Sequence, residues 1–445
     1  MRSAATTTDG WRGLPSPAWS ELHLLAAIDR AAASGALGDR VLVGFDGRAG
    51  AAEVAALAAD LLTARNITCM LATEPAPTPA FGLFTHTRPE VTGAVIATAS
   101  HNPPGYIGVK LRDAQGQGIT WTQPVENTVI APPAVLTSPH RRIDVTAFYA
   151  ALIGQAVVDA ARRFDGHLII DAAHGAVAAL APHLPELAWH RGRPLPFFAG
   201  CIPDPAARPA ADELAATVLR AAPDPGRTMV AMVAMVDGDG DRLALFTARS
   251  GYVASPEQAA ILLRAGLPAA RLITTTVAPS MITHAARSQD LAVTRTPVGF
   301  KHIVTAQREQ PGIPTLGVEP NGALAWSGNG DCGYFERDSL AALATTLTRF
   351  TGVQDFDDAI ADLRRDHPHP QQIITVSAPV EDTTGRLRTL LGGWHASAQD
   401  DVTVFENDSH GRVAVRASGT EPVTRLYLET DPATTERISA ALSSV

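Results

Sequence analysis

Three short segments of the chain carry side chains suited to phosphate chemistry. The first is Thr98–Lys110, TASHNPPGYIGVK, in which the hydroxyl of Ser100 stands beside the imidazole of His101. The second is Asp237–Arg242, with carboxylates at alternate positions, and the third is Arg416–Pro422, RASGTEP. A nucleophile, a divalent-metal site and a phosphate-binding loop in one chain indicate phosphoryl transfer on a small molecule.

The serine segment follows a predicted strand. The apolar, β-branched run Val91–Ala97 favours a buried strand that ends at an SHNPP turn. A hydrolase elbow would need glycines two residues before and after the serine, but Thr98 and Asn102 stand there. A serine that carries phosphate needs an exposed hydroxyl, amide donors and a cation, which the turn and Lys110 provide. The alternative is a plain turn between a strand and a loop.

The aspartate segment predicts a site for a hard cation. An EF-hand would need glycine and glutamate at its sixth and twelfth positions, but Arg242 and Ala248 stand there. On an extended loop alternate residues point the same way, so Asp237, Asp239 and Asp241 can converge on one ion. Oxygen ligands of this kind suit Mg²⁺, with Arg242 as a second positive group beside it. The alternative is a solvated acidic turn.

The third segment has the composition of an anion site. Arg416, Ser418, Gly419 and Thr420 together offer a guanidinium, two hydroxyls and backbone amides. This combination suits a phosphate dianion. A simple turn between two strands is the alternative.

Lysine is almost absent from the chain. Of 36 basic residues only Lys110 and Lys301 are lysines, and both lie in glycine-marked loops, GVK and VGFK. Because arginine replaces lysine almost everywhere else, these two positions point to a need for a compact ammonium group. Chance is the alternative interpretation.

The composition sets the class of protein. The chain has 445 residues, a net charge of −9 and a pI near 5.9. This argues against binding of nucleic acid or of an anionic membrane by the whole chain. Cys69, Cys201 and Cys332 follow no ligand spacing, and the longest apolar run, Met229–Val236, is too short to cross a bilayer. We therefore expect a soluble, cytoplasmic protein without a targeting segment.

The order of predicted elements indicates several domains. Strands and helices alternate from about residue 41, and the alternation restarts at 167–171 and at 271–276. This pattern favours α/β domains with largely parallel sheets, followed by a tail of short strands that we interpret as a small α+β domain. The expected domains are 1–150 with the serine loop, 151–250 with the metal loop, 251–367 with a sugar-binding loop, and 368–445 with the phosphate-binding loop.

In combination, these motifs resemble the α-D-phosphohexomutase family, which includes phosphoglucomutases and phosphomannomutases. The resemblance covers nearly the whole chain in the family's order. TASHNPPGYIGVK is similar to its phosphoserine loop, DGDGDR to its magnesium loop, and RASGTEP to its phosphate loop. Gly317–Gly322, GVEPNG, resembles the sugar loop, Thr8–Gly13 the N-terminal motif, and Thr296–Lys301 a third-domain loop that contacts substrate. The family's fold is three related α/β domains with mixed sheets and a smaller C-terminal α+β domain around a central cleft.

The resemblance implies a mechanism. Ser100 would be carried as phosphoserine, with Mg²⁺ between its phosphate and the three aspartates, and a sugar bisphosphate would be both intermediate and activator. His101, Lys110 and Arg12 would position the phosphate or move the hydroxyl proton, and the general acid or base is left open among them. The substrate-binding residues implied are Arg242, Lys301, Glu319, Asn321, Arg416, Ser418, Gly419 and Thr420.

The sugar loop departs from the commonest family pattern. Asn321 stands where serine is usual and Ala323 where histidine is common, although Glu319 can still bind adjacent hydroxyls. We expect interconversion of 1-phospho and 6-phospho sugars of the glucose or mannose type. The alternatives are a mutase for glucosamine or N-acetylglucosamine phosphate, and a metal-dependent sugar phosphatase. The partner expected is the phosphosugar alone, with the protein a monomer or homodimer.

Overall fold

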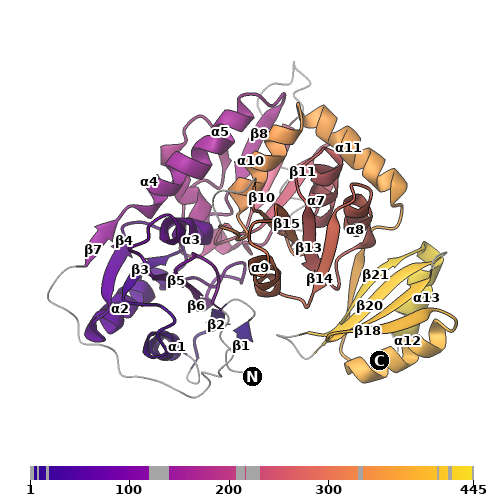
Figure 1. Ribbon diagram of the computed structural model, residues 1–445, viewed down its shortest axis with the longest axis horizontal. Helices are drawn as coiled ribbons and strands as arrows, with labels where there is room; N and C mark the ends of the chain where they lie inside the picture. The colour runs from indigo at the N-terminus through magenta and orange to yellow at the C-terminus, as the bar shows by residue number, and fades with distance from the viewer. Residues whose placement is uncertain are drawn as a thin grey trace.

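The chain folds into four β-sheets that follow one another along the sequence, each flanked by helices (Figure 1). The computed structural model describes residues 5–7, 10–16, 20–119, 140–206, 216, 231–328, 334–407, 410–418 and 423–442. The fold class predicted from the sequence is confirmed, because three domains with mixed sheets precede a smaller α+β domain.

The first sheet has seven strands in the order β1-β2-β6-β5-β3-β4-β7. The strands are β1 (Ala5–Thr7), β2 (Gly10–Gly13), β3 (Arg40–Phe45), β4 (Thr68–Ala72), β5 (Gly93–Ala97), β6 (Ile107–Arg112) and β7 (Arg141–Ile143). The helices are α1 (Glu21–Ala33), α2 (Ala51–Ala64), α3 (Thr78–His86) and α4 (Val145–Tyr149). β3, β4, β5 and β7 run parallel, and β6 returns antiparallel to β5. All five residues of β5 are buried, as its continuous apolar run predicts.

The second sheet has the order β12-β11-β10-β8-β9. Its strands are β8 (His167–Asp171), β9 (Ala188–His190), β10 (Ala231–Val236), β11 (Leu243–Thr247) and β12 (Gly251–Val253). The helical segments are η1 (Ala150–Gly154), α5 (Gln155–Ala161), η2 (Ala176–His183) and η3 (Phe198–Gly200). A boundary at residue 250 would assign β12 to the third domain, but β12 pairs with β11 in this sheet. β11 and β12 form a hairpin, and a domain boundary at residue 250 would separate its two strands.

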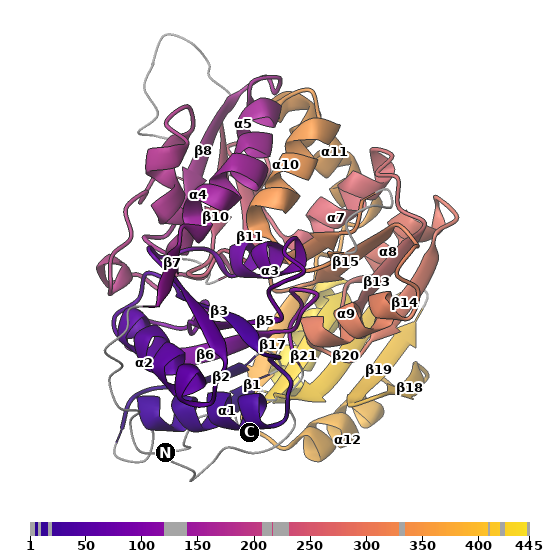
Figure 2. The ribbon, with the colours of Figure 1, turned by 60° about the vertical axis from the view of Figure 1, so that its left-hand side comes forward.

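The third sheet has the order β14-β13-β15-β16. Its strands are β13 (Arg271–Thr275), β14 (Ala292–Thr296), β15 (Thr315–Glu319) and β16 (Ala323–Trp326). The helices are α7 (Ser255–Arg264), α8 (Ser280–Arg287), α9 (Phe300–Arg308), α10 (Ser339–Arg349) and α11 (Val353–Asp366). In Figures 1 and 2, α10 lies beside α5, so the second and third domains pack against each other.

The fourth sheet is antiparallel throughout, in the order β17-β21-β20-β19-β18. Its strands are β17 (Gln372–Val376), β18 (His395–Gln399), β19 (Val402–Asn407), β20 (Gly411–Ala417) and β21 (Thr424–Thr430). The helices are α12 (Val380–Leu390) and α13 (Pro432–Leu442).

The buried apolar side chains form several clusters, and two of them distinguish the first three domains from the fourth. One continuous cluster of buried side chains runs through the first three domains and includes Leu42, Leu245 and Leu343. The fourth domain has a separate cluster around Leu387 and Leu428. The first three domains therefore pack as one body, and the fourth is built on its own core. In the part of the chain that the structure describes, no helix is long and apolar enough to cross a membrane.

Candidate functional site

The serine loop leaves β5 in a strained conformation. The sequence predicted an exposed hydroxyl, but Ser100 is buried because the aspartate loop packs against it. Its φ is +53°, in the left-handed region that a residue with a Cβ seldom adopts. The Arg48 guanidinium holds it there by donating hydrogen bonds to the carbonyl oxygens of Ser100 at 2.6 Å and Tyr106 at 2.9 Å. Asp46 fixes the guanidinium in turn, with Oδ2 2.9 Å from Arg48 Nε.

Asp46 and Arg48 form a support that the sequence analysis missed. Thr98 Oγ1 donates to Asp46 Oδ2 at 2.7 Å and accepts from the amide of Ser100 at 2.9 Å. Burial raises the pKa of Asp46, against the opposing effect of the Arg48 charge. The available signal was position: both residues directly follow β3, the parallel neighbour of β5, and sites in α/β sheets gather at the carboxyl ends of strands.

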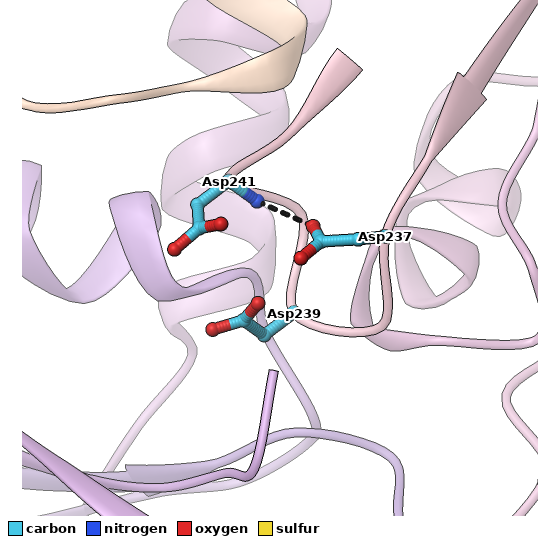
Figure 3. Close-up of side chains that lie close together, drawn as sticks. All are labelled: Asp237, Asp239 and Asp241. Carbon is cyan, nitrogen blue, oxygen red and sulfur yellow. Dashed lines mark hydrogen bonds between the residues drawn. The ribbon is translucent and has the colours of Figure 1, made fainter. Parts of the chain in front are cut away.

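The aspartate loop joins β10 to β11 and brings three carboxylates together (Figure 3). Asp237, Asp239 and Asp241 are all buried, and each offers an oxygen within 4.8 Å of the others. The backbone wraps around Asp237, whose Oδ1 accepts hydrogen bonds from the amides of Asp241 at 3.0 Å and Arg242 at 3.1 Å. The predicted convergence of the three side chains is therefore observed.

The serine loop and the aspartate loop meet directly. Ser100 Oγ donates a hydrogen bond to Asp237 Oδ2 at 3.2 Å. The backbones approach closely as well, because a Cβ at Gly238 would lie 2.6 Å from the Ser100 carbonyl oxygen. Only glycine permits this approach, which places the nucleophile beside the acidic loop.

The acidic loop has the features of a divalent-cation site. Among the described residues, Asp239 Oδ1 and Asp241 Oδ1 are buried oxygen atoms without a hydrogen-bond partner. Burial, and then the charges of Asp241 and Asp239, hold the pKa of Asp237 well above its usual range. A divalent cation would satisfy the free oxygens and offset the crowded negative charge, and an all-oxygen ligand set suits Mg²⁺.

Lys110 pairs with two of the aspartates. Its Nζ lies 2.7 Å from Asp239 Oδ2 and 2.6 Å from Asp241 Oδ2, and the side chain is 1% exposed. Thr78 Oγ1 also donates to Asp239 Oδ2, at 2.6 Å. Burial alone would raise the pKa of Asp239, but the Lys110 charge and these hydrogen bonds outweigh it and lower that pKa. Lys110 thus binds Oδ2 of both aspartates, Thr78 also binds Oδ2 of Asp239, and the two Oδ1 atoms remain available to a cation.

His101, Arg12 and Arg242 complete the surroundings of Ser100. His101 Nδ1 lies 3.4 Å from Ser100 Oγ, and Arg12 donates to Asn102 Oδ1 at 3.3 Å. Burial of the His101 ring, followed by the positive charges of Arg242 and Arg12, holds its pKa well below the usual value. The burial and the neighbouring positive charges therefore favour the neutral form of the imidazole.

The predicted sugar loop joins β15 to β16 next to the aspartate loop. Glu319 is buried at the end of β15, and its carbonyl oxygen accepts from Ser255 Oγ at 2.8 Å. The same hydroxyl accepts from the amide of Gly322 at 3.1 Å, and the Gly322 carbonyl accepts from the amide of Leu243 at 2.9 Å. Asn321 uses its side-chain oxygen within the loop, accepting from the backbone amide two residues on. The sugar loop is therefore hydrogen-bonded to Leu243, the residue after Arg242.

Lys301 lies at the start of α9, where it lines a small cavity between the first and third domains. Phe300, Glu336 and Arg337 share this lining with residues 118 and 119 of the first domain. Arg337 also reaches the aspartate loop, with Nε 2.8 Å from Asp241 Oδ2. No sequence motif had pointed to Arg337, because its neighbours in the chain carry no recognisable pattern.

The fourth predicted group lies apart from the other three. Arg416, near the end of β20, has Nε 3.3 Å from Asp401 Oδ2, and the amide of Ser418 donates to the Val423 carbonyl at 2.8 Å. Within the described residues, no hydrogen bond or ion pair joins Arg416 to Ser100 or to the three aspartates. Gly419 and Thr420 lie outside the described residues.

Comparison with known proteins identifies the family. Residues 4–131 match the family model for phosphoglucomutase/phosphomannomutase, alpha/beta/alpha domain I. Residues 256–364 match the model for alpha/beta/alpha domain III, and 392–443 match the C-terminal domain. The chain belongs to the phosphoglucomutase/phosphomannomutase family. This phosphohexomutase is accordingly an intramolecular phosphotransferase, as the motifs predicted.

Individual relatives of this phosphohexomutase align over most of its length. A phosphoglucosamine mutase from Roseobacter denitrificans is 30% identical over 456 residues, covering 95% of this chain and 93% of that protein. The structure of a phosphoglucomutase/phosphomannomutase family protein from Burkholderia thailandensis matches with a TM-score of 0.75 and 20% identity, covering 99% and 96% of the two chains. An Aspergillus fumigatus N-acetylphosphoglucosamine mutase, solved in complex with GlcNAc-6P and magnesium, matches with a TM-score of 0.52 and 14% identity, covering 91% and 82%. At these identities the two structures are evidence of the shared fold alone.

Proposed function

We propose that this enzyme interconverts hexose 1-phosphates and 6-phosphates through a phosphorylated Ser100 and a sugar bisphosphate. The observation that carries the proposal is the 3.2 Å hydrogen bond from Ser100 Oγ to Asp237 Oδ2. It joins a strained, buried nucleophile to a cluster of carboxylates that fits a divalent cation. A hydroxyl at such a place is suited to carry a phosphoryl group and release it to a substrate.

In the first half-reaction, a sugar hydroxyl oxygen attacks the phosphorus carried by Ser100. A new O–P bond forms on the sugar, the bond between Ser100 Oγ and phosphorus breaks, and the hydroxyl proton leaves. In this proposal His101, whose Nδ1 lies 3.4 Å from Ser100 Oγ, would take that proton. Lys110 and Arg12 hold positive charge around the transferring group, which stabilises its spread negative charge. Mg²⁺ held by the three aspartates would add positive charge at the same place.

In the second half-reaction, the bisphosphate sugar presents its other phosphate to Ser100 after turning round. This reversal needs a second anion site for the phosphate that is not reacting. Arg416 and Ser418, with Gly419 and Thr420 of the same motif, would supply that site. Arg242, Lys301, Glu319 and Asn321 would contact the sugar and its phosphate between the two sites.

The sugar is proposed to be of the glucose or mannose type, which a carboxylate such as Glu319 can bind through adjacent hydroxyls. A second candidate is glucosamine phosphate, which the name of the Roseobacter denitrificans relative favours. A panel of glucose, mannose, glucosamine and N-acetylglucosamine phosphates, assayed with Mg²⁺ and a trace of bisphosphate, separates these candidates by kcat/KM.

The phosphoserine is tested by Ser100→Ala, followed by ³¹P NMR of the 1-phosphate and 6-phosphate pools. We expect interconversion to fall by at least about 1,000-fold, because no other group would carry the phosphoryl in transit. Ser34→Ala, at an exposed serine, is the matched control and should keep full activity. Full turnover by Ser100→Ala would overturn the proposal, and steady release of inorganic phosphate by the wild type would identify a phosphatase.

A further inference from the structure

Residues 334–339 of the third domain form a bridge to the other domains of the site. At one end, the hydroxyl of Tyr334 donates to the carbonyl oxygen of Pro79 in the first domain at 3.1 Å. At the other end, Ser339 Oγ donates to the carbonyl oxygen of Gly240, within the aspartate loop, at 2.7 Å. This bridging segment therefore contacts both the first domain and the loop that carries the metal-binding carboxylates.

Arg337 extends from the bridging segment into the site. Its side chain is 6% exposed, and Nε lies 2.8 Å from Asp241 Oδ2. The guanidinium carbon lies 5.5 Å from the centre of the Phe300 ring, a cation–π arrangement that fixes its plane. Because Phe300 precedes Lys301 and both line the same cavity as Arg337, this arginine links the acidic loop to the substrate side of the third domain.

The charges at Asp241 are unusually concentrated. Its Oδ2 is held by two cations, Arg337 at 2.8 Å and Lys110 at 2.6 Å. Its Oδ1 has no hydrogen-bond partner among the described residues. With Arg337 removed, Lys110 would still hold Oδ2, so the carboxylate would keep its orientation while the acidic loop became more negative by one charge.

We propose that Arg337 is a positioning residue that the third domain supplies as a fixed counter-charge to the acidic loop. It lowers the loop's affinity for a divalent cation and adds positive charge beside the transferring phosphoryl group. The expected change in rate rests on the proposed function, whereas the change in cation affinity does not. A purely structural role would instead loosen the site, weakening cation binding and slowing the reaction together.

The test combines two measurements on Arg337→Met. Titration of the metal-free protein with Mn²⁺, followed by electron paramagnetic resonance, gives the dissociation constant without any substrate. We expect binding to tighten by about tenfold, because a repelling charge has been removed from a buried site. The kcat with a hexose phosphate should fall by about 10- to 100-fold, because stabilising positive charge is lost. Arg337→Lys keeps the charge and should bind Mn²⁺ as the wild type does, with kcat partly restored.

The matched control is Arg308→Met on α9. Arg308 also bridges the third domain to the first, through contacts with Asp113 and Gln117, but it does not touch the acidic loop. It should leave the Mn²⁺ dissociation constant unchanged. Weaker or unchanged Mn²⁺ binding by Arg337→Met would overturn the inference, as would tighter binding by Arg337→Lys. Failure of the proposed function would appear separately, as a wild type that binds Mn²⁺ but interconverts no sugar phosphate.

Discussion

The region around Ser100 and the region around Arg416 both have groups suited to phosphate, but they are packed very differently. Ser100 and Lys110 are each 1% exposed, and the residues that hold them come from the first and second domains, which share one apolar cluster with the third. Arg416 pairs with Asp401, whose side chain is 54% exposed, on a domain with a core of its own. The proposed function would thus place the chemistry in the interior that the first three domains share, and the second anion site on a domain with a core of its own, which we expect to adjust to the substrate.

The contacts between the third and fourth domains support this contrast. Val277 packs among apolar side chains of the fourth sheet, including Val404 and Tyr427. Around it the contacts are polar: Ser280 Oγ donates to Glu429 Oε2 at 2.6 Å, and Arg412 donates to a third-domain carbonyl. A small apolar patch ringed by hydrogen bonds is typical of domain interfaces that permit relative motion.

The largest effect is expected from Lys110→Met, which removes the cation shared by Asp239 and Asp241. Asp239 would lose its ion-pair partner and Asp241 one of its two, so the free energy of unfolding should fall by about 3–5 kcal/mol in metal-free protein. Urea denaturation measures this loss, and part of the lost stability should return when Mg²⁺ is present. The kcat should fall by at least about 1,000-fold. A variant as stable as the wild type without metal would show that the interior site does not depend on this pairing.

A smaller effect concerns Asp338, which lies within the bridging segment as the N-cap of α10. Its Oδ1 accepts from the Tyr149 hydroxyl at 2.6 Å and from the Ala341 amide at 2.9 Å. Burial raises the pKa of Asp338 to about 6. Between pH 4 and 6 the unfolded carboxyl loses its proton while the folded one keeps it, so stability falls as pH rises, by about 3 kcal/mol in total.

Asp338→Asn tests this dependence on pH. Asparagine can accept the same two hydrogen bonds but cannot ionise, so the fall in melting temperature between pH 4 and 6 should flatten. Calorimetric scans at half-unit pH steps provide the measurement. An unchanged slope would mean that other groups set the pH response of the three-domain body.

The smallest change in stability is expected from Arg416→Gln in the adjustable part. In its ion pair with Asp401, the Asp401 side chain is 54% exposed to solvent. Loss of the pair should therefore change the free energy of unfolding by less than about 1 kcal/mol. The KM for the phosphosugar should rise by about tenfold or more through loss of a charge-assisted contact, with a lesser change in kcat. If kcat fell as far as in Lys110→Met, the division between rigid and adjustable regions would be wrong.

Much of this arrangement could be predicted from the sequence, because the strongest signals lie where strands end. The strands predicted at 167–171 and 271–276 are observed at His167–Asp171 and Arg271–Thr275, and the predicted run Val91–Ala97 contains β5 (Gly93–Ala97). The convergence of the three aspartates also follows from alternation along the loop. The proximity of the aspartates to Ser100 was predicted only from the family resemblance, because no local sequence pattern brings together residues 137 positions apart.

The residues that the sequence did not reveal act through long-range packing. Arg48 supports Ser100 from 52 positions away, and Arg337 reaches Asp241 from 96 positions away (337 minus 241). An arginine is common on any surface, and its role depends on which carboxylate the fold brings near. The boundary expected at residue 250 falls in the turn of the β11–β12 hairpin, because the three-residue strand β12 gives only a weak signal in the sequence.

The scarcity of lysine has a practical consequence for handling the enzyme. Lys110 is sealed in the interior, so acylating reagents and amine crosslinkers have a single partly exposed lysine side chain, Lys301, to modify. Lysine-directed coupling would here be directed to the wall of the small cavity between the first and third domains. Under the proposed function, in which Lys301 contacts the substrate, dyes or resins attached in that way would inactivate the enzyme.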